Sequence, residues 1–260
     1  MKYFLFFFLT TTPFYCQTGK ITYSSILNFE GSKEKQTKSE LFFTNNASFY
    51  RSQVKTDKKT ENDENSEDSE SGKVVEMNIT VGTDSKGNVY YRNLQSRNII
   101  CREAIFRNPG LKYYIYEDAT NIKWQLLDEF KEISGYKCQK AITAFRGRMY
   151  EAWFASEIPL SFGPWKFSGL PGLILEVYDQ TGEVYFSAEH IQIPYSNAEK
   201  IVQKPSGDPT IDYREFIEKQ DGNSAKITQA ILARAPKGST LVSSKTIKKG
   251  IELEHPWEKE

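Results

Sequence analysis

The sequence predicts a mainly β protein: a strongly curved antiparallel sheet, in a half-barrel-like meander, with one or two C-terminal α-helices. Apolar and polar residues alternate in many short runs, and this period of two is typical of half-buried strands. Turn signals rich in Gly, Asn and Asp separate the runs. The 17 Phe and 15 Tyr, against three Met, favour a sheet over a helix bundle.

The expected strands follow one another along most of the chain. In the first, Ile21, Tyr23 and Leu27 share one face, and Thr22 and Asn28 lie on the other. Further runs cover residues 40–43, 47–54, 74–81, 89–94, 99–106, 112–116, 122–130, 136–145, 148–155, 173–178 and 183–193. Because a sheet of this size twists, we expect it to curl around its apolar contents.

Helices are expected after the last strand, where they would cover an open side or edge of the sheet. Asp208 and Pro209 suit the N-cap and first position of a helix that presents Phe216 and Ile217. A second helix would begin at residue 223 or 224 and end near residue 234. The charged stretch 240–260 is expected to form a tail on the surface.

Residues 1–16 have the features of a secretory signal peptide, with Lys2 ahead of a short apolar run. The run is shorter than the roughly 20 residues that span a bilayer, although a retained anchor is the alternative. Phe14 and Tyr15 argue against a lipidated Cys16, because a lipobox has small residues there. We therefore expect a secreted or periplasmic product that begins near Gln17, with no transmembrane segment in the mature chain.

Residues 17–260 are expected to form a single domain, interrupted by an acidic and disordered insertion at 55–73. The insertion is too polar to bury a core, and it lacks the EF-hand spacing for calcium. In the whole chain 34 basic residues balance 34 acidic ones, which argues against a nucleic-acid partner. Two histidines exclude a His-rich metal centre, and no cofactor motif is present. No metal or cofactor is expected.

From Trp124 onward the sequence carries aromatic and glycine motifs in a fixed order. They are Gly135-Tyr136-Lys137-Cys138, Trp153-Phe154, Gly163-Pro164-Trp165-Lys166-Phe167 and Gly169-Leu170-Pro171-Gly172-Leu173-Ile174. This set resembles the GLPGLI family of exported Bacteroidota proteins, most strongly over residues 124–193. The resemblance implies a cell-envelope location and a curved β fold, similar to the half-barrels of periplasmic lipoprotein carriers, but it implies no reaction.

The GLPGLI hexamer has two interpretations. Pro171 and Gly172 suit the central positions of a type II turn, in which Gly supplies a positive φ. Trp165 and Phe167 would share one face, and Lys166 would point away from it. The segment is then either a structural corner around an aromatic core, or it helps Trp153, Trp165 and Phe167 to form the rim of a groove for an apolar ligand or a glycan.

Removal of the signal segment leaves Cys101 and Cys138 as the only cysteines. In an oxidising compartment such a pair tends to form a disulfide. The alternative is two isolated buried thiols that behave as small apolar side chains. The sequence leaves both open.

No catalytic arrangement can be assembled from the sequence, and we expect a non-enzyme. His190 lies in a strand without an evident nucleophile. Four carboxylates are candidates for a glycosidase pair, but nothing pairs them: Glu151, Glu157, Glu176 and Glu183. The leading hypothesis is binding of a hydrophobic ligand, a peptide or an envelope protein partner. The alternatives are a carboxylate-dependent hydrolase of envelope glycans or peptides, and a purely structural or interaction module.

Overall fold

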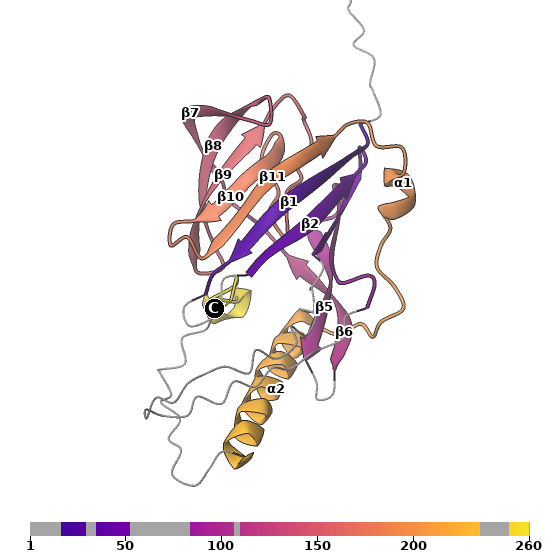
Figure 1. Cartoon of the computed structure of the whole chain (residues 1–260), viewed down its shortest axis with the longest axis vertical. Coiled ribbons are helices and arrows are strands. Elements are labelled where there is room, and N and C mark those ends of the chain that lie inside the picture. Colours follow the sequence, from indigo (N-terminus) through magenta and orange to yellow (C-terminus); the bar gives the residue numbers. More distant parts are fainter. Residues whose placement is uncertain (1–16, 30–34, 53–83, 107–109, 235–249, 260) are drawn as a thin grey trace, which may run out of the picture.

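The computed structural model describes residues 17–29, 35–52, 84–106, 110–234 and 250–259. They form one 11-stranded antiparallel sheet, which confirms the predicted fold class (Figure 1). Its strands are β1 (Gly19–Leu27), β2 (Lys35–Phe43), β3 (Ala47–Ser52), β4 (Asn88–Asn93), β5 (Asn98–Phe106), β6 (Leu111–Ala119), β7 (Gln125–Ile133), β8 (Tyr136–Phe145), β9 (Arg148–Ala155), β10 (Leu173–Asp179) and β11 (Val184–Gln192). The expected strand at 74–81, the signal segment 1–16 and the insertion 55–73 lie outside the described residues.

The sheet is a meander whose first and last strands meet in its middle. The spatial order is β6-β5-β4-β3-β2-β1-β11-β10-β9-β8-β7, so every neighbouring pair except β1–β11 is consecutive in sequence. β6 and β7 form the two edges, and the sheet is not closed. It is nevertheless strongly curved. The curvature is evident from the ion pair between Asp118, near the end of β6, and Arg146, which follows β8 near the other end of the strand order.

The helical region differs from the two expected helices. A four-residue helix, α1 (Ala198–Ile201), precedes a single long helix, α2 (Tyr213–Arg234). Residues 209–211 instead run along edge strand β6: Ile115 N donates to Pro209 O, and Ile211 N donates to Ile115 O, both at 2.9 Å. Asp212 then caps α2, because its Oδ1 accepts the Arg214 N–H at 2.8 Å. Among the described residues, no helix is long and apolar enough to cross a membrane.

The concave side of the sheet is filled by the connection between β9 and β10, which we call the internal loop (residues 156–172). Phe162, Trp165 and Phe167 of this loop are all buried. The Phe167 ring lies 4.7 Å from the Tyr150 ring of β9 and 6.3 Å from the Phe186 ring of β11. The internal loop is therefore part of the aromatic core.

The GLPGLI hexamer forms the exit of the internal loop, but its glycines act differently from the prediction. Gly169 has the positive φ, +96°, whereas Gly172 lies outside the left-handed region. A Cβ on Gly172 would overlap the carbonyl of Ala155. The expected type II turn is thus wrong in its detail: Gly172 is required by close approach to the end of β9, not by its backbone angle.

The C-terminal segment (residues 250–259) does not form the expected surface tail. Leu253 N and Glu254 N both donate to Arg146 O, at 2.9 and 3.3 Å, and His255 is buried. A short 3-10 turn, η1 (Pro256–Lys259), ends this segment. In Figure 1 it lies beside the ends of β1 and β2, close to the start of α2.

Candidate functional site

A half-open pocket of about 230 Å³, which we call the interior cavity, remains at one end of the concave face. Its apolar lining comes from Leu27, Tyr50, Tyr90, Trp165, Phe186 and Ile251. Its polar lining comes from Ser25, Thr37, Ser52 and Asn88, at the ends of β1 to β4. The cavity thus lies between the sheet, the internal loop and the C-terminal segment.

Trp165 occupies the cavity wall with an unusual backbone. Its φ is +52°, a left-handed value that a bulky residue rarely adopts. The side chain is fixed by Phe167, at 5.2 Å between ring centroids, and by Phe145, at 6.0 Å. Such strain persists only where surrounding contacts hold it, and it is frequent at ligand sites.

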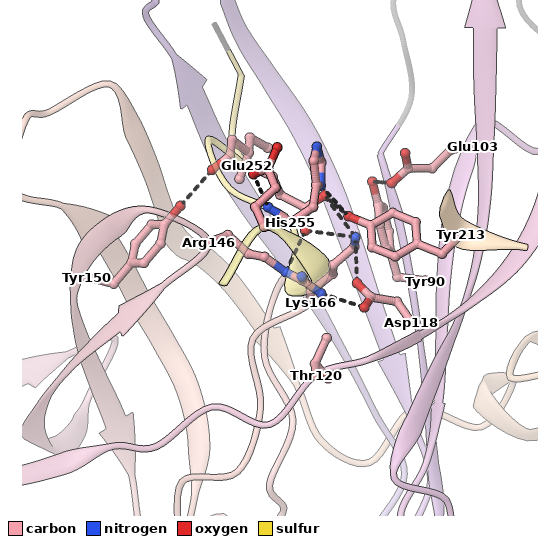
Figure 2. A network of polar contacts seen from close by, with 12 residues as sticks. Tyr90, Glu103, Asp118, Thr120, Arg146, Tyr150, Lys166, Tyr213, Glu252 and His255 are labelled. Carbon is pink, nitrogen blue, oxygen red and sulfur yellow. Dashed lines mark hydrogen bonds and ion pairs between the residues drawn. The ribbon is translucent and has the colours of Figure 1, made fainter. Parts of the chain in front are cut away.

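Four charged side chains meet beside the cavity, and we call them the buried ion network (Asp118, Arg146, Lys166 and Glu252). Lys166 is fully buried; its Nζ lies 2.9 Å from Asp118 Oδ2 and 3.0 Å from Glu252 Oε1. Arg146 Nη2 contacts the other Asp118 oxygen at 2.5 Å, and Arg146 Nε lies 3.2 Å from Glu252. Figure 2 shows these side chains converging from β6, the β8–β9 turn, the internal loop and the C-terminal segment.

The buried ion network remains charged because its members stabilise one another. Burial alone would lower the pKa of the Lys166 ammonium, but Glu252 and Asp118 raise it well above its ordinary value. Burial likewise opposes the charge on Arg146, and the same two carboxylates raise its pKa. Both cations are therefore held in the interior by acids from distant parts of the chain.

Aromatic side chains close the network on the side of α2. Tyr213 Oη donates to Glu252 Oε2 at 2.9 Å and lies 3.2 Å from His255 Nδ1. The Tyr213 ring stacks on Tyr116 of β6 at 4.8 Å. The start of α2 and the C-terminal segment therefore pack on the network as one cover.

A further carboxyl group, Glu103 of β5, accepts a hydrogen bond from the cavity-lining Tyr90. Burial raises the pKa of this carboxyl, an effect that Lys166 partly offsets. The cavity thus has acidic and basic neighbours, although its own walls are mostly apolar.

The structure brings together two of the three residues predicted to form a ligand groove. Trp165 and Phe167 are in contact inside the sheet. Trp153 lies on the opposite face of β9 from Tyr150, beneath Lys131 and Lys140, whose Nζ atoms lie 4.4 and 5.7 Å from its ring. Phe167 fills the core rather than a rim, so only Trp165 lines the cavity.

All four carboxylates considered for hydrolysis have partners: three form ion pairs, and Glu157 accepts a backbone hydrogen bond. Glu151 pairs with Lys140 at 2.9 Å and Glu176 with Lys131 at 2.6 Å, on the outer face around Trp153. Burial acts to raise the pKa of Glu151, but hydrogen bonds from Tyr178 and Lys140 outweigh burial and lower this pKa. A general acid needs a raised pKa instead. Glu183 pairs with Arg148 at 2.7 Å, and Glu157 Oε1 accepts the Lys137 N–H at 3.3 Å. The other residue considered, His190, is exposed in β11.

Of the two alternatives for the cysteines, the structure has the one without a disulfide. Cys101 and Cys138 are both free and buried. They belong to β5 and β8, which are near opposite ends of the strand order. The alternative prediction, two isolated buried thiols, describes them correctly.

Sequence reasoning missed the buried ion network. Lys166 stands between two aromatic residues, and in a strand it would face solvent; the internal loop turns it inward instead. Glu252 belongs to a charged stretch that resembled a solvated tail. The one available signal was Asp118, a charge at the end of an aromatic strand.

A second hollow, a groove of about 500 Å³, lies outside the sheet near β3 to β5 and residues 203–206. Its guanidinium groups are already paired: Arg51 with Glu40, and Arg102 with Asp84 and Asp208. Within the described ranges, no three His, Cys, Asp or Glu side chains converge as a metal site would require. The interior cavity is therefore the better candidate for a binding site.

Comparisons with known proteins support the fold and leave the function open. A family described as "Protein of unknown function (Porph_ging)" matches residues 143–176, from the end of β8 through the hexamer into β10. No curated protein sequence matches the chain.

Two solved structures of PNGF-II, in the P21 and C2 space groups, resemble the chain with TM-scores of 0.54 and 0.53. Each is 16% identical and covers 80% of this chain, which spans only about a third of theirs (34% and 33%). At this identity the likeness concerns the fold alone.

Proposed function

We propose that the protein is an exported cell-envelope protein of the GLPGLI type that binds, without catalysis, an apolar group of a ligand in the interior cavity. The observation that carries this proposal is the cavity itself, a half-open hollow lined mostly by apolar and aromatic side chains at one end of the aromatic core. Concave apolar hollows with a few polar groups at their edge are the usual form of small-molecule sites.

The dimensions and lining of the cavity indicate what it accepts. At about 230 Å³ it is smaller than the roughly 300–1,000 Å³ of sites for drug-sized ligands. It therefore accommodates one ring or a short acyl chain rather than a whole lipid. Tyr50, Trp165 and Phe186 offer apolar ring surface, and Ser25 and Thr37 supply polar edges.

Export and family type are supported by other parts of the chain. Residues 1–16 have the charge and apolar run of a signal peptide. The match to the family of unknown function includes Gly169–Ile174, which gives the GLPGLI family its name. A hydrophobic ligand suits a protein of the cell envelope, where lipids and peptides are abundant.

Native mass spectrometry after exposure to an envelope lipid extract tests the proposal. The chain beginning at Gln17 is expected to retain a bound small molecule, whereas Thr37→Phe, which places a ring in the cavity, is expected to remain empty. Lys38→Phe is the matched control: it adds the same ring to the same strand at a side chain that is 69% exposed. Equal retention by Thr37→Phe and the parent would reject the cavity as the binding site.

A further inference from the structure

We infer that the interior cavity and the buried ion network form one site for an amphipathic carboxylate, and that Ile251 and Glu252 occupy it as an internal substitute for this ligand. The inference rests on the proposed function and names its ligand class. It also assigns a role to the C-terminal segment, which closes the site while no ligand is bound.

Two neighbouring residue pairs join the cavity to the network. Trp165 lines the cavity and the next residue, Lys166, binds the carboxylate of Glu252. On the other wall Ile251 lines the cavity and Glu252 follows it. Lys166 Nζ lies 5.5 Å from the centroid of the Trp165 ring, so the apolar wall and the carboxylate site adjoin.

Glu252 sits in a site built for a carboxylate but does not satisfy it completely. Lys166 Nζ donates to its two oxygens at 3.0 and 3.1 Å, and Tyr213 Oη donates at 2.9 Å. Arg146 Nε lies 3.2 Å away but has no hydrogen-bond partner among the described residues, although the side chain is only 6% exposed. A carboxylate free of the chain could be placed to accept this bond as well.

The charges indicate that the ligand carries one negative charge. Without Glu252, the cations Lys166 and Arg146 would face Asp118 as their one remaining acid within the buried ion network. Exchange of one carboxylate for another keeps the buried charges paired, whereas simple departure of Glu252 would not.

The C-terminal segment can leave without breaking the sheet. It is held by side-chain contacts of Glu252 and His255 with Lys166, Arg146 and Tyr213, and by Gly250 O and Ile251 O, which accept from Arg148 Nη2 at 2.7 Å and Tyr150 Oη at 3.3 Å. The N–H groups of Leu253 and Glu254 donate to the turn residue Arg146, not to a strand ladder. Displacement therefore exchanges these contacts for those of the ligand and leaves the strand pairing intact.

Calorimetric titration with decanoate and with decanol, its neutral counterpart, tests the inference. Glu252→Gln keeps the shape of the side chain and removes its charge, so we expect it to bind decanoate at least about tenfold more tightly than the parent, because the internal competitor is weakened. Decanol has no carboxylate for Lys166 and Arg146, so its affinity should rise much less than that of decanoate. Glu218→Gln removes a charge from the exposed surface of α2 and should change neither affinity.

Hydrogen exchange in the unmodified chain gives an independent readout that does not depend on how well the variant folds. Decanoate is expected to speed exchange in residues 250–259, and decanol is not.

The peptide acetyl-alanyl-isoleucine and its C-terminal amide extend the binding comparison, because a peptide C-terminus carries the same carboxylate group as a fatty acid. Tighter binding of the peptide acid than of decanoate would assign a peptide source, and the reverse order a lipid source.

The outcomes separate the inference from the proposed function. If decanol and decanoate bind equally, Glu252→Gln changes neither affinity and exchange is unaltered, the inference is overturned while the cavity remains a binding site. If neither compound binds the parent or Glu252→Gln, and both proteins remain folded by circular dichroism, the proposed function fails with it.

Discussion

Gly172 and Gly222 are glycines with opposite surroundings, and alanine should affect them in opposite directions. A Cβ at Gly172 would overlap the Ala155 carbonyl, whereas at Gly222 in α2 nothing lies within 4 Å. Gly172→Ala is expected to lower the free energy of unfolding by about 1–3 kcal/mol through overpacking. Gly222→Ala should raise it by about 0.5–1 kcal/mol through helix propensity. Urea unfolding measures both, and equal effects would contradict this account of Gly172.

The two thiols should be present, reduced and unreactive in the folded protein. Burial raises the pKa of Cys138 to about 11 and that of Cys101 well above its ordinary value, so little thiolate exists near neutral pH. We expect slow alkylation of the folded chain and two thiols per chain from Gln17 onward after denaturation without reductant. A count of zero would show that the cysteines pair after all.

For single residues, the sequence predicted which side chains matter better than where they lie in the fold. It identified Trp165 and Phe167 as important aromatic residues, and the structure places both in the interior. It predicted that Lys166 points away from the face of Trp165 and Phe167 but not that Lys166 is buried, since alternation describes strands and Lys166 lies in a loop. Its partner Glu252 is 86 positions away, a separation at which no local pattern operates.

Among the structural elements, the buried ion network fastens the internal loop to β6 and to the C-terminal segment. Lys166→Met would leave Asp118 facing Arg146 alone and remove a cation from Glu252, at an expected cost of about 3–5 kcal/mol in unfolding free energy. The control Lys38→Met breaks an exposed pair with Glu189 and should cost about 0–1 kcal/mol. Similar losses in the two variants would show that the network contributes little to stability.

Strands β1 to β3 should contribute stability that depends on pH through Glu40. Burial acts to raise the pKa of the Glu40 carboxyl, but hydrogen bonds from Lys20 and Arg51 outweigh burial and lower this pKa. A lowered carboxyl pKa stabilises the fold above the unfolded-state pKa, and this contribution is lost as pH falls through the folded-state value. The stability difference between the parent and Glu40→Gln should therefore shrink on acidification. A difference that stays constant with pH would contradict the assignment.

The sequence predicted strands more accurately than helices, for a physical reason. Short turns and a period of two fix a meander locally, and β8 and β9 begin and end where expected. The start of α2 depends on a distant partner: Pro209 and Ile211 hydrogen-bond to Ile115 of β6, which keeps Asp208 and Pro209 out of the helix. Local capping signals contain no information on such a contact.

At the scale of the whole molecule, curvature creates the candidate site. The sheet brings Asp118 of β6 next to Arg146 at the far end of the strand order, and the internal loop fills most of the space between them. The sequence predicted this curved sheet, because a long antiparallel meander twists. It could not predict the cavity, whose walls come from β1 to β4, β11, residue 165 and residue 251.

Location of a heavy-atom ligand tests the central claim, that the interior cavity binds an apolar group, most directly. A crystal of the chain from Gln17, soaked with terminally brominated decanol, would place the bromine by its anomalous signal. We predict one dominant peak in the space between Tyr50, Trp165 and Ile251, and none there in Thr37→Phe. An empty cavity at a probe concentration that saturates binding in solution, or a peak confined to the outer groove near Arg102, would contradict the account.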